Sequence, residues 1–427
     1  MSLSPKQIDK LADNYIIGLY EELEREVIAD IARRVSKTGR YTETAELMAK
    51  AMREQGFSTG RIQREVMKLL RADPDYKRSV AQTTKEYKQY ISNVIRDTVT
   101  KAANLGDRLI GAAGDMAFND DLKAWKDNGV DLTKPSGLGR LFDSFKKQTK
   151  GELRNITNTM AFKSTALGTV GVTNAVQRAL DMAVLKTSTG TFSYNQAVKD
   201  VITEMARSGL RSVDYASGRS YQLDTAARMC VRTACSQLAG KITEENLKKT
   251  GQDLVYVSAH PGARPTHAQW QGKVYYFFEE RPVKGYHWIG DNEPVNGGQG
   301  CGYGQMLGLK GINCTHEFYP YFEGTSVIPE FTEHEPVTYK GKEMTYYEAT
   351  QEQRRQERAI RATKREIEAC EVLGEDTAQL KAKLQMQSKE YKRFSEIADL
   401  RPKPERTQVI KGTSDLTKTT TYRKNSK

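Results

Sequence analysis

Apolar side chains recur at helical spacing through most of the first 250 residues. The pattern is clearest in three stretches, residues 8–31, 62–70 and 87–109. A repeat of three to four residues is typical of amphipathic helices, and glycine or proline interrupts it, so we expect breaks at Gly56, Pro74 and Gly106. Residues 129–151 are rich in Gly, Pro, Lys and Ser, which predicts a loop or hinge within the helical part.

The strongest single helix signal begins at Ser193. This serine can cap a helix whose third residue is Gln196, and an apolar stripe then continues to Gly209, where a left-handed stop is permitted. After a short polar turn, a second stripe covers residues 223–247. Two helices joined in this way predict a helical hairpin within residues 186–250.

The hydrophobic period changes at Gly251. Residues 254–257 and 273–278 are rich in β-branched and aromatic side chains, which predicts short strands. Nine glycines then occur between residues 285 and 311, and a loop of that composition requires a metal, a partner or aromatic packing to order it. We therefore expect a small, loop-rich α+β module over residues 251–334.

The remaining segments complete the predicted organisation. A weakly amphipathic, highly charged stretch interrupted at Gly374 predicts a helical hairpin within residues 335–410, followed by a polar tail at 411–427. Residues 1–185 form a helical region without a recognisable motif. The fold class that follows is a mainly α-helical N-terminal region, a small α+β His/Cys module and a C-terminal helical hairpin.

Charge divides the chain in the same places. The formal net charge is +12. Residues 1–250 carry 40 Lys and Arg against 30 Asp and Glu, residues 251–334 carry 5 against 9, and residues 335–427 carry 21 against 15. Basic flanks favour contact with polyanions such as nucleic acid, but interspersed charges of both signs equally suit a solvated helical surface.

Targeting signals, membrane spans and disulfide patterns indicate the cellular compartment of a protein. The sequence shows no targeting signal and no uninterrupted apolar stretch long enough for a membrane span, so we expect no membrane-spanning segment. The chain has five cysteines, an odd number spread over a long segment, which does not indicate a disulfide framework. Synthesis in a reducing cytoplasm fits this pattern.

All five histidines lie between residues 260 and 334, interleaved with two cysteines. These side chains ligate soft metals, and a C-x-H pair on a strand places both on one face. The candidate zinc ligands are His267, Cys301, Cys314 and His316, with His260 and His287 as alternates. The gaps between them match no standard zinc finger, so histidines hydrogen-bonded among aromatic residues remain an alternative that needs no metal.

An enzymatic interpretation has weaker support. Cys314 with His316 or His267 could form a nucleophile and base pair, but no recognised nucleophile context surrounds the cysteine. The sequence also lacks a P-loop, a G-x-G-x-x-G element and the zinc-deaminase signature. We therefore assign no catalytic residue from the sequence.

Three runs closely resemble the phage minor capsid protein 2 family and, more distantly, Mu-F-like head-morphogenesis proteins: YASGRSYQLDTAARMCVRTACSQLAGK, DLVYVSAHPGARPTHAQWQGKVYYF and GYGQMLGLKGINCTHEFYPYFEGTS. The shared pattern places Arg264 and His267 before a G-K-V-[FY] strand. A later N-C-R-C element corresponds to Asn313-Cys314-Thr315-His316, in which histidine replaces the second cysteine and keeps a ligand type at that spacing. The strong part of the resemblance covers residues 190–325, and the charged helical stretch after Tyr346 also resembles the C-terminal region of the family.

The resemblance implies a non-enzymatic structural protein of the virion, associated with the portal and the inner face of the head. Its expected role is head assembly or DNA delivery, its expected partners are the portal protein, other capsid proteins and packaged DNA, and its assembly would occur in the bacterial cytoplasm. Two alternatives stay open. The first is a metal-dependent nuclease or an effector-like hydrolase that uses the His/Cys module for catalysis, and the second is a plain nucleic-acid-binding protein. An enzyme requires the ligands to converge on an open cleft, whereas a structural site is closed.

Overall fold

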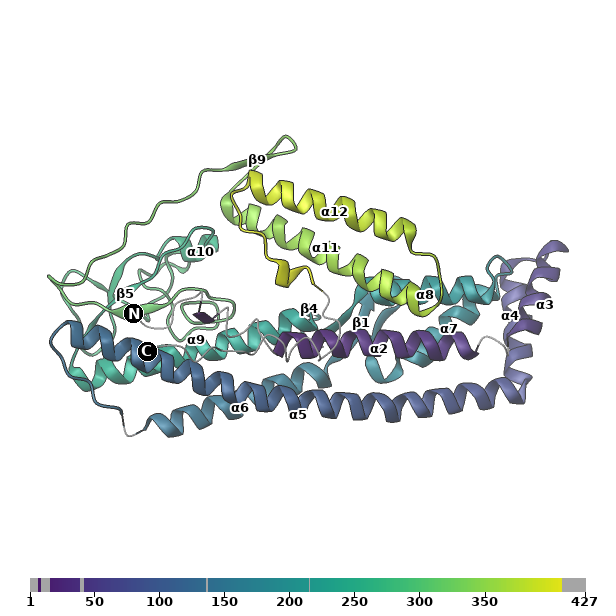
Figure 1. The fold of residues 1–427 in the computed structure, drawn as a ribbon, viewed down its shortest axis with the longest axis horizontal. Coiled ribbons are helices and arrows are strands. Elements are labelled where there is room, and N and C mark those ends of the chain that lie inside the picture. The colour runs from purple at the N-terminus through teal and green to yellow at the C-terminus, as the bar shows by residue number, and fades with distance from the viewer. Residues whose placement is uncertain (1–6, 9–15, 39–41, 136, 215, 409–427) are drawn as a thin grey trace, which may run out of the picture.

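The computed structural model of the chain describes residues 7–8, 16–38, 42–135, 137–214 and 216–408. Long helices run side by side along one axis of the molecule (Figure 1). A four-stranded sheet that contains residues 254–257 lies at one end of these helices, and two short helices, residues 43–54 and 59–72, lie at the other. Residues 9–15 of the first predicted helix and the predicted polar tail, residues 411–427, fall outside the described residues.

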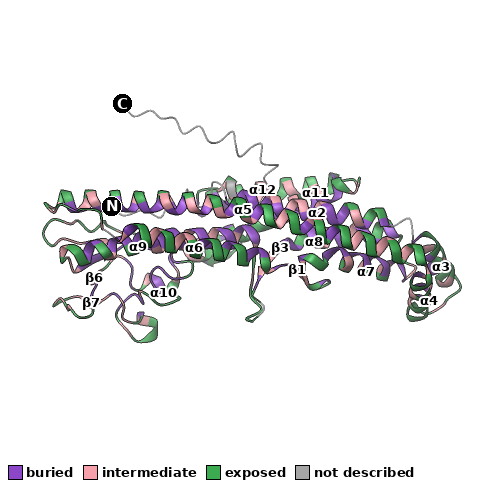
Figure 2. Ribbon diagram, turned by 90° about the horizontal axis from the view of Figure 1, so that it is seen from below, coloured by how far each residue is buried: buried purple, intermediate pink, exposed green. Residues whose placement is uncertain are grey.

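Eight helices make up the N-terminal body as described: α2 (Ile16–Thr38), α3 (Glu43–Glu54), α4 (Thr59–Ala72), α5 (Pro74–Asp127), α6 (Leu138–Asn158), α7 (Ala175–Thr187), α8 (Tyr194–Ser208) and α9 (Leu223–Thr250). Buried residues follow the faces where these helices meet (Figure 2). The 54 residues of α5 span about 80 Å at 1.5 Å per residue. The mainly helical N-terminal region is therefore confirmed.

The predicted break at Gly106 is wrong, because this glycine lies inside α5. Its position is explained by helix packing: a Cβ at Gly106 would lie 3.4 Å from Leu153 Cδ1 of α6. About two helical turns further along α5, a Cβ at Gly114 would lie only 2.2 Å from the Phe142 ring of α6. These glycines let α6 approach α5 closely, whereas Pro74 does start a helix, capped by the Asp73 carboxylate.

The loop predicted over residues 129–151 is also too long, since α6 already begins at Leu138. Apolar side chains on one face of α6 pack against α5, among them Leu138, Leu153 and Ile156. This packing outweighs the helix-weakening glycines of the segment.

A small sheet, absent from the prediction, lies within the helical body. It consists of β1 (Met160–Ser164), β2 (Gly168–Gly171), β3 (Leu210–Val213) and β4 (Ser220–Gln222), all antiparallel, in the order β2-β1-β3-β4. The polar turn that was expected between α8 and α9 is therefore the β3–β4 hairpin. The main packing partner of α8 is α7, and that of α9 is α5, so α8 and α9 are not each other's main partners. Strands of three to five residues carry too few positions for a period-2 pattern.

The second sheet belongs to the module after Gly251. It contains β5 (Leu254–Val257), β6 (Val274–Tyr276), β7 (His287–Trp288) and β8 (Phe318–Pro320) in the order β7-β6-β5-β8. Its core is shared with the body, because Trp125 of α5 and Leu247 of α9 are buried in the same cluster as Trp270. The two strands predicted from sequence correspond to β5 and β6.

The C-terminal helical hairpin is confirmed as α11 (Tyr346–Val372) and α12 (Ala378–Ile397). It follows the short hairpin of β9 (Val337–Tyr339) and β10 (Lys342–Met344), and Thr345 with Glu348 forms a capping box at the start of α11. Within the described residues, every helix is too short or too polar to cross a lipid bilayer.

Buried ion pairs hold α11 against the body. Arg365 Nη1 lies 3.4 Å from Glu24 Oε2 of α2, and Arg361 pairs with Asp224 of α9. The Arg365 Nε–H also donates to the carbonyl oxygen of Ala206 at 2.8 Å. Charges of this kind are costly to bury singly, so these contacts fix the position of the hairpin.

Asp121 provides a test of the α5–α9 contact. This fully buried carboxyl accepts hydrogen bonds from Asn246 Nδ2 at 2.9 Å and Thr243 Oγ1 at 3.3 Å, and burial raises its pKa from 3.8 to about 7. Folding then takes up a proton between these values, so the free energy of unfolding is highest below the lower pKa and falls as the pH rises through about 7. We expect Asp121→Asn, which cannot ionise, to flatten this fall. Urea denaturation from about pH 5 to 8 measures it, and an unchanged slope would contradict the assignment.

Candidate metal centre

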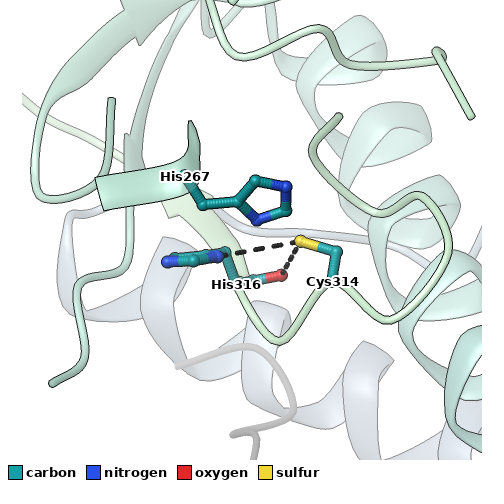
Figure 3. Close-up of side chains that lie close together, drawn as sticks. All are labelled: His267, Cys314 and His316. Carbon is teal, nitrogen blue, oxygen red and sulfur yellow. Dashed lines mark hydrogen bonds between the residues drawn. The ribbon is translucent and has the colours of Figure 1, made fainter. Parts of the chain in front are cut away.

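Two neighbouring segments bring the candidate ligands together. His267 lies on the short helix α10 (Pro265–Ala268), which Pro265 starts at its first position. Cys314 and His316 lie in the segment leading into β8, where Asn313 adopts a positive φ of 57° that asparagine tolerates. The alternation of Cys314-Thr315-His316 turns both ligand side chains toward His267 (Figure 3).

The ligand atoms of His267, Cys314 and His316 all lie within 4.8 Å of one another. The Cys314 Sγ atom is 3.8 Å from His316 Nδ1. All three residues are buried, with exposed fractions of 2%, 8% and 1% in that order. The three side chains are therefore largely buried rather than exposed at the protein surface.

Hydrogen bonds at the Nε2 atoms, which face away from Cys314, fix the tautomer of the His267 and His316 imidazoles. His267 Nε2 lies 2.9 Å from the Leu307 carbonyl oxygen, which can only accept, so Nε2 carries the proton. His316 Nε2 lies 3.0 Å from Gln271 Oε1, an atom that also accepts the backbone N–H of His260 and is thereby identified as oxygen. Both rings consequently direct an unprotonated Nδ1 toward Cys314 (Figure 3). Metal-binding histidines are typically oriented by such outer acceptors.

Burial keeps the two imidazoles neutral. It lowers the pKa of His267 to about 4 and, with the neighbouring histidines, that of His316 to about 2. Burial also raises the pKa of the Cys314 thiol. Neutral imidazole is the form that binds a metal, and a bound cation would deprotonate the thiol.

The donor set fits zinc. Zinc takes imidazole nitrogen at about 2.0 Å and thiolate sulfur at about 2.3 Å in a tetrahedron, which separates ligand atoms by roughly 3.3–3.8 Å. The spacing of Cys314 Sγ and His316 Nδ1 already falls in this range, at 3.8 Å. Only small side-chain movements would bring His267 to the same distance.

The other predicted ligands lie outside this group. The His260 ring stacks on His316 with centroids 4.3 Å apart, and its Nε2 contacts the Thr315 hydroxyl. Cys301 is buried with its thiol beside the Tyr275 hydroxyl, and His287 is exposed on β7. Sequence spacing indicated the residue types of the site, but it could not tell which of the two buried cysteines lies beside His267 and His316.

Several supporting residues were not anticipated. Gln271 and the Leu307 carbonyl orient the two histidines, and Glu293 accepts the Trp270 indole N–H at 2.8 Å beside His267. The buried Lys310–Glu317 pair, in which Ser236 also donates to Glu317, brackets the Cys314 segment. The two charges are seven residues apart on an irregular loop, a spacing that carries no recognisable signal.

Comparison with known proteins gives two matches. A family model described as phage minor capsid protein 2 matches residues 3–395. A protein named "Structural protein" from Lactococcus phage LL-H is 27% identical over 277 residues, which cover 62% of this chain and 70% of that protein. No solved structure matches the chain.

The Lys310–Glu317 pair yields a stability prediction. Lys310→Met would leave the Glu317 carboxylate buried without its countercharge, so we expect the free energy of unfolding to fall by about 3–5 kcal/mol. Lys310→Met combined with Glu317→Gln removes both charges and should recover much of the loss. Chemical denaturation of the two variants and the wild type measures this, and a Lys310→Met protein as stable as the wild type would show that the pair does not hold the segment.

Proposed function

The chain belongs to the phage minor capsid protein 2 family, and on this basis we propose that it is a portal-associated structural protein of the virion that acts in head assembly or DNA delivery. The family match over residues 3–395 is the observation that carries the proposal. The proposed partners are the portal protein and other capsid proteins, with packaged DNA as a further contact. The proposed location is the portal or inner face of the head, after assembly in the bacterial cytoplasm.

The architecture supports a structural role. A body of long parallel and antiparallel helices, about 80 Å in the case of α5, provides extended surfaces for other virion proteins (Figure 1). The net charge of +12 favours acidic partners and DNA. Both features suit a protein that bridges components of a particle.

The metal centre belongs to this proposal as a structural element. His267, Cys314 and His316 would hold one zinc ion, with a water molecule in the fourth position. A free position is typical of catalytic zinc, whereas burial of all three ligands is typical of structural zinc. Because substrate would need access to the ion, the burial favours a role in stabilising the module over nuclease or hydrolase chemistry.

The zinc assignment predicts about one zinc ion per chain in protein purified without chelator. His267→Ala and Cys314→Ser should each lose the ion, since they remove a ligand. His287→Ala is the matched control, because His287 is exposed and outside the group. Elemental analysis by mass spectrometry gives the metal content. Wild-type protein that stays metal-free after zinc supplementation, or equal zinc loss in all three variants, would contradict the assignment.

A second prediction separates the structural role from an enzymatic one. Phage carrying His267→Ala should show lower solubility of the protein and lower incorporation into heads together, because both follow from a destabilised module. Mass spectrometry of purified virions measures the incorporation. If the variant instead folds and enters heads normally while a nuclease or hydrolase activity of the wild type disappears, the protein is an enzyme.

A further inference from the structure

A second feature, which shares Cys314 with the candidate metal centre, lies between α9 and α11. The two helices face each other across a pocket of about 170 Å³, bordered by the loop residues Asn313 and Cys314 and by the 3₁₀ turn η4 (Pro404–Arg406). Six guanidinium groups line it: Arg228 and Arg232 from α9, Arg354, Arg358 and Arg361 from α11, and Arg406 from η4.

The pocket holds far more positive than negative charge. Among the described side chains, the lining carboxylates are Asp224 and Glu357, four fewer than the guanidinium groups. Both carboxylates are already engaged, Asp224 with Arg361 and Glu357 with the Tyr391 hydroxyl, whose oxygen is 3.2 Å from Glu357 Oε1. Arg361 also lies 3.8 Å from Glu21 Oε1 of α2, and the described lining still holds more guanidinium groups than carboxylates.

Helical spacing crowds these like charges on both walls. Arg228 and Arg232 are four residues apart on α9, and Arg354 and Arg358 are four apart on α11, a spacing at which like charges repel. Desolvation of the guanidinium by the surrounding side chains, followed by the charges of Arg406 and Arg232, lowers the pKa of Arg354. Crowding of this kind opposes folding and would be relieved by a bound anion.

Hydrogen-bond donors in the pocket also lack acceptors. Arg361 is only 6% exposed, and its Nε has no hydrogen-bond partner among the described residues, as is also true of the buried Nε of Arg406. Thr225, Thr233 and Asn313 add neutral donors to the lining. Buried donors without acceptors are rare in folded proteins and indicate a missing partner.

We propose that this pocket binds a phosphate group. Guanidinium groups pair with phosphate oxygens through two parallel hydrogen bonds, and donors converging from two helices, a loop and a turn suit a tetrahedral anion. A pocket of about 170 Å³ admits a single phosphate, free or at the end of a nucleic-acid strand, but not a double helix. The inference rests on the arginines and not on the proposed virion role, although Cys314 borders both the pocket and the metal centre.

Titration of the full-length protein with inorganic phosphate in a calorimeter, at constant ionic strength set with chloride, tests the site. We expect saturable binding that is about tenfold or more weaker in Arg354→Gln/Arg406→Gln. Arg393→Gln with Arg401→Gln, which removes two charges outside the pocket, should change it by less than about twofold. Circular dichroism of each variant establishes that it is folded, and the single variant Arg354→Gln gives the same comparison if the double variant is not. Absence of saturable binding, or equal weakening in both double variants, overturns the proposal.

A competition experiment identifies the source of the phosphate. Two oligonucleotides of the same sequence, with and without a 5′-phosphate, are added to the phosphate-loaded protein. Displacement by the phosphorylated strand alone supports the pocket and assigns it to strand ends, whereas displacement by neither strand supports it as a site for the free anion. Equal displacement by both strands that persists in the double variant places nucleic-acid binding elsewhere and overturns the assignment of this pocket.

Discussion

The packing of α5 against α9 is the contact on which the rest of the molecule depends. These two helices are far apart in sequence, yet Asp121, Thr243 and Asn246 join them through buried hydrogen bonds. Along the body, their apolar faces form the main core with α2 and α6. At their far ends, Trp125 and Leu247 enter the core of the His/Cys module. The module thus has no apolar core of its own that is complete without the helices.

This dependence explains how a glycine-rich segment can be ordered. The loop between β7 and β8 packs backbone against backbone: a Cβ at Gly308 would lie 2.1 Å from the Gly302 carbonyl oxygen, and one at Gly311 would lie 2.3 Å from that of Met306. Such approaches leave no space for a side chain, so glycine is required for packing as well as for flexibility. The Leu307 carbonyl is held in this loop, and it orients His267.

Local signals in the sequence were sufficient where the cause of structure is local. Helix α8 has the predicted cap at Ser193 and the predicted stop at Gly209, and β5 covers residues 254–257 as expected. Prediction failed where the cause lies in distant residues: Gly106 reads as a break until α6 is placed against it. The candidate metal site shows the same difference between features with local causes and features that depend on distant residues. The C-x-H spacing and the histidine cluster indicated three side chains that do lie together, whereas the positions of Cys301 and of Gln271, which contacts His316, depend on how separate loops meet.

The placement of the tryptophans gives the molecule an internal optical reporter. The chain has three, and Trp125, Trp270 and Trp288 all lie in or against the core of the His/Cys module. Tryptophan fluorescence, excited apart from tyrosine, consequently reports on that core, while far-ultraviolet circular dichroism is dominated by the helices of the body. Because Trp125 is contributed by α5, coincidence of the two signals during unfolding would mean that body and module form one cooperative unit, and their separation would mean two.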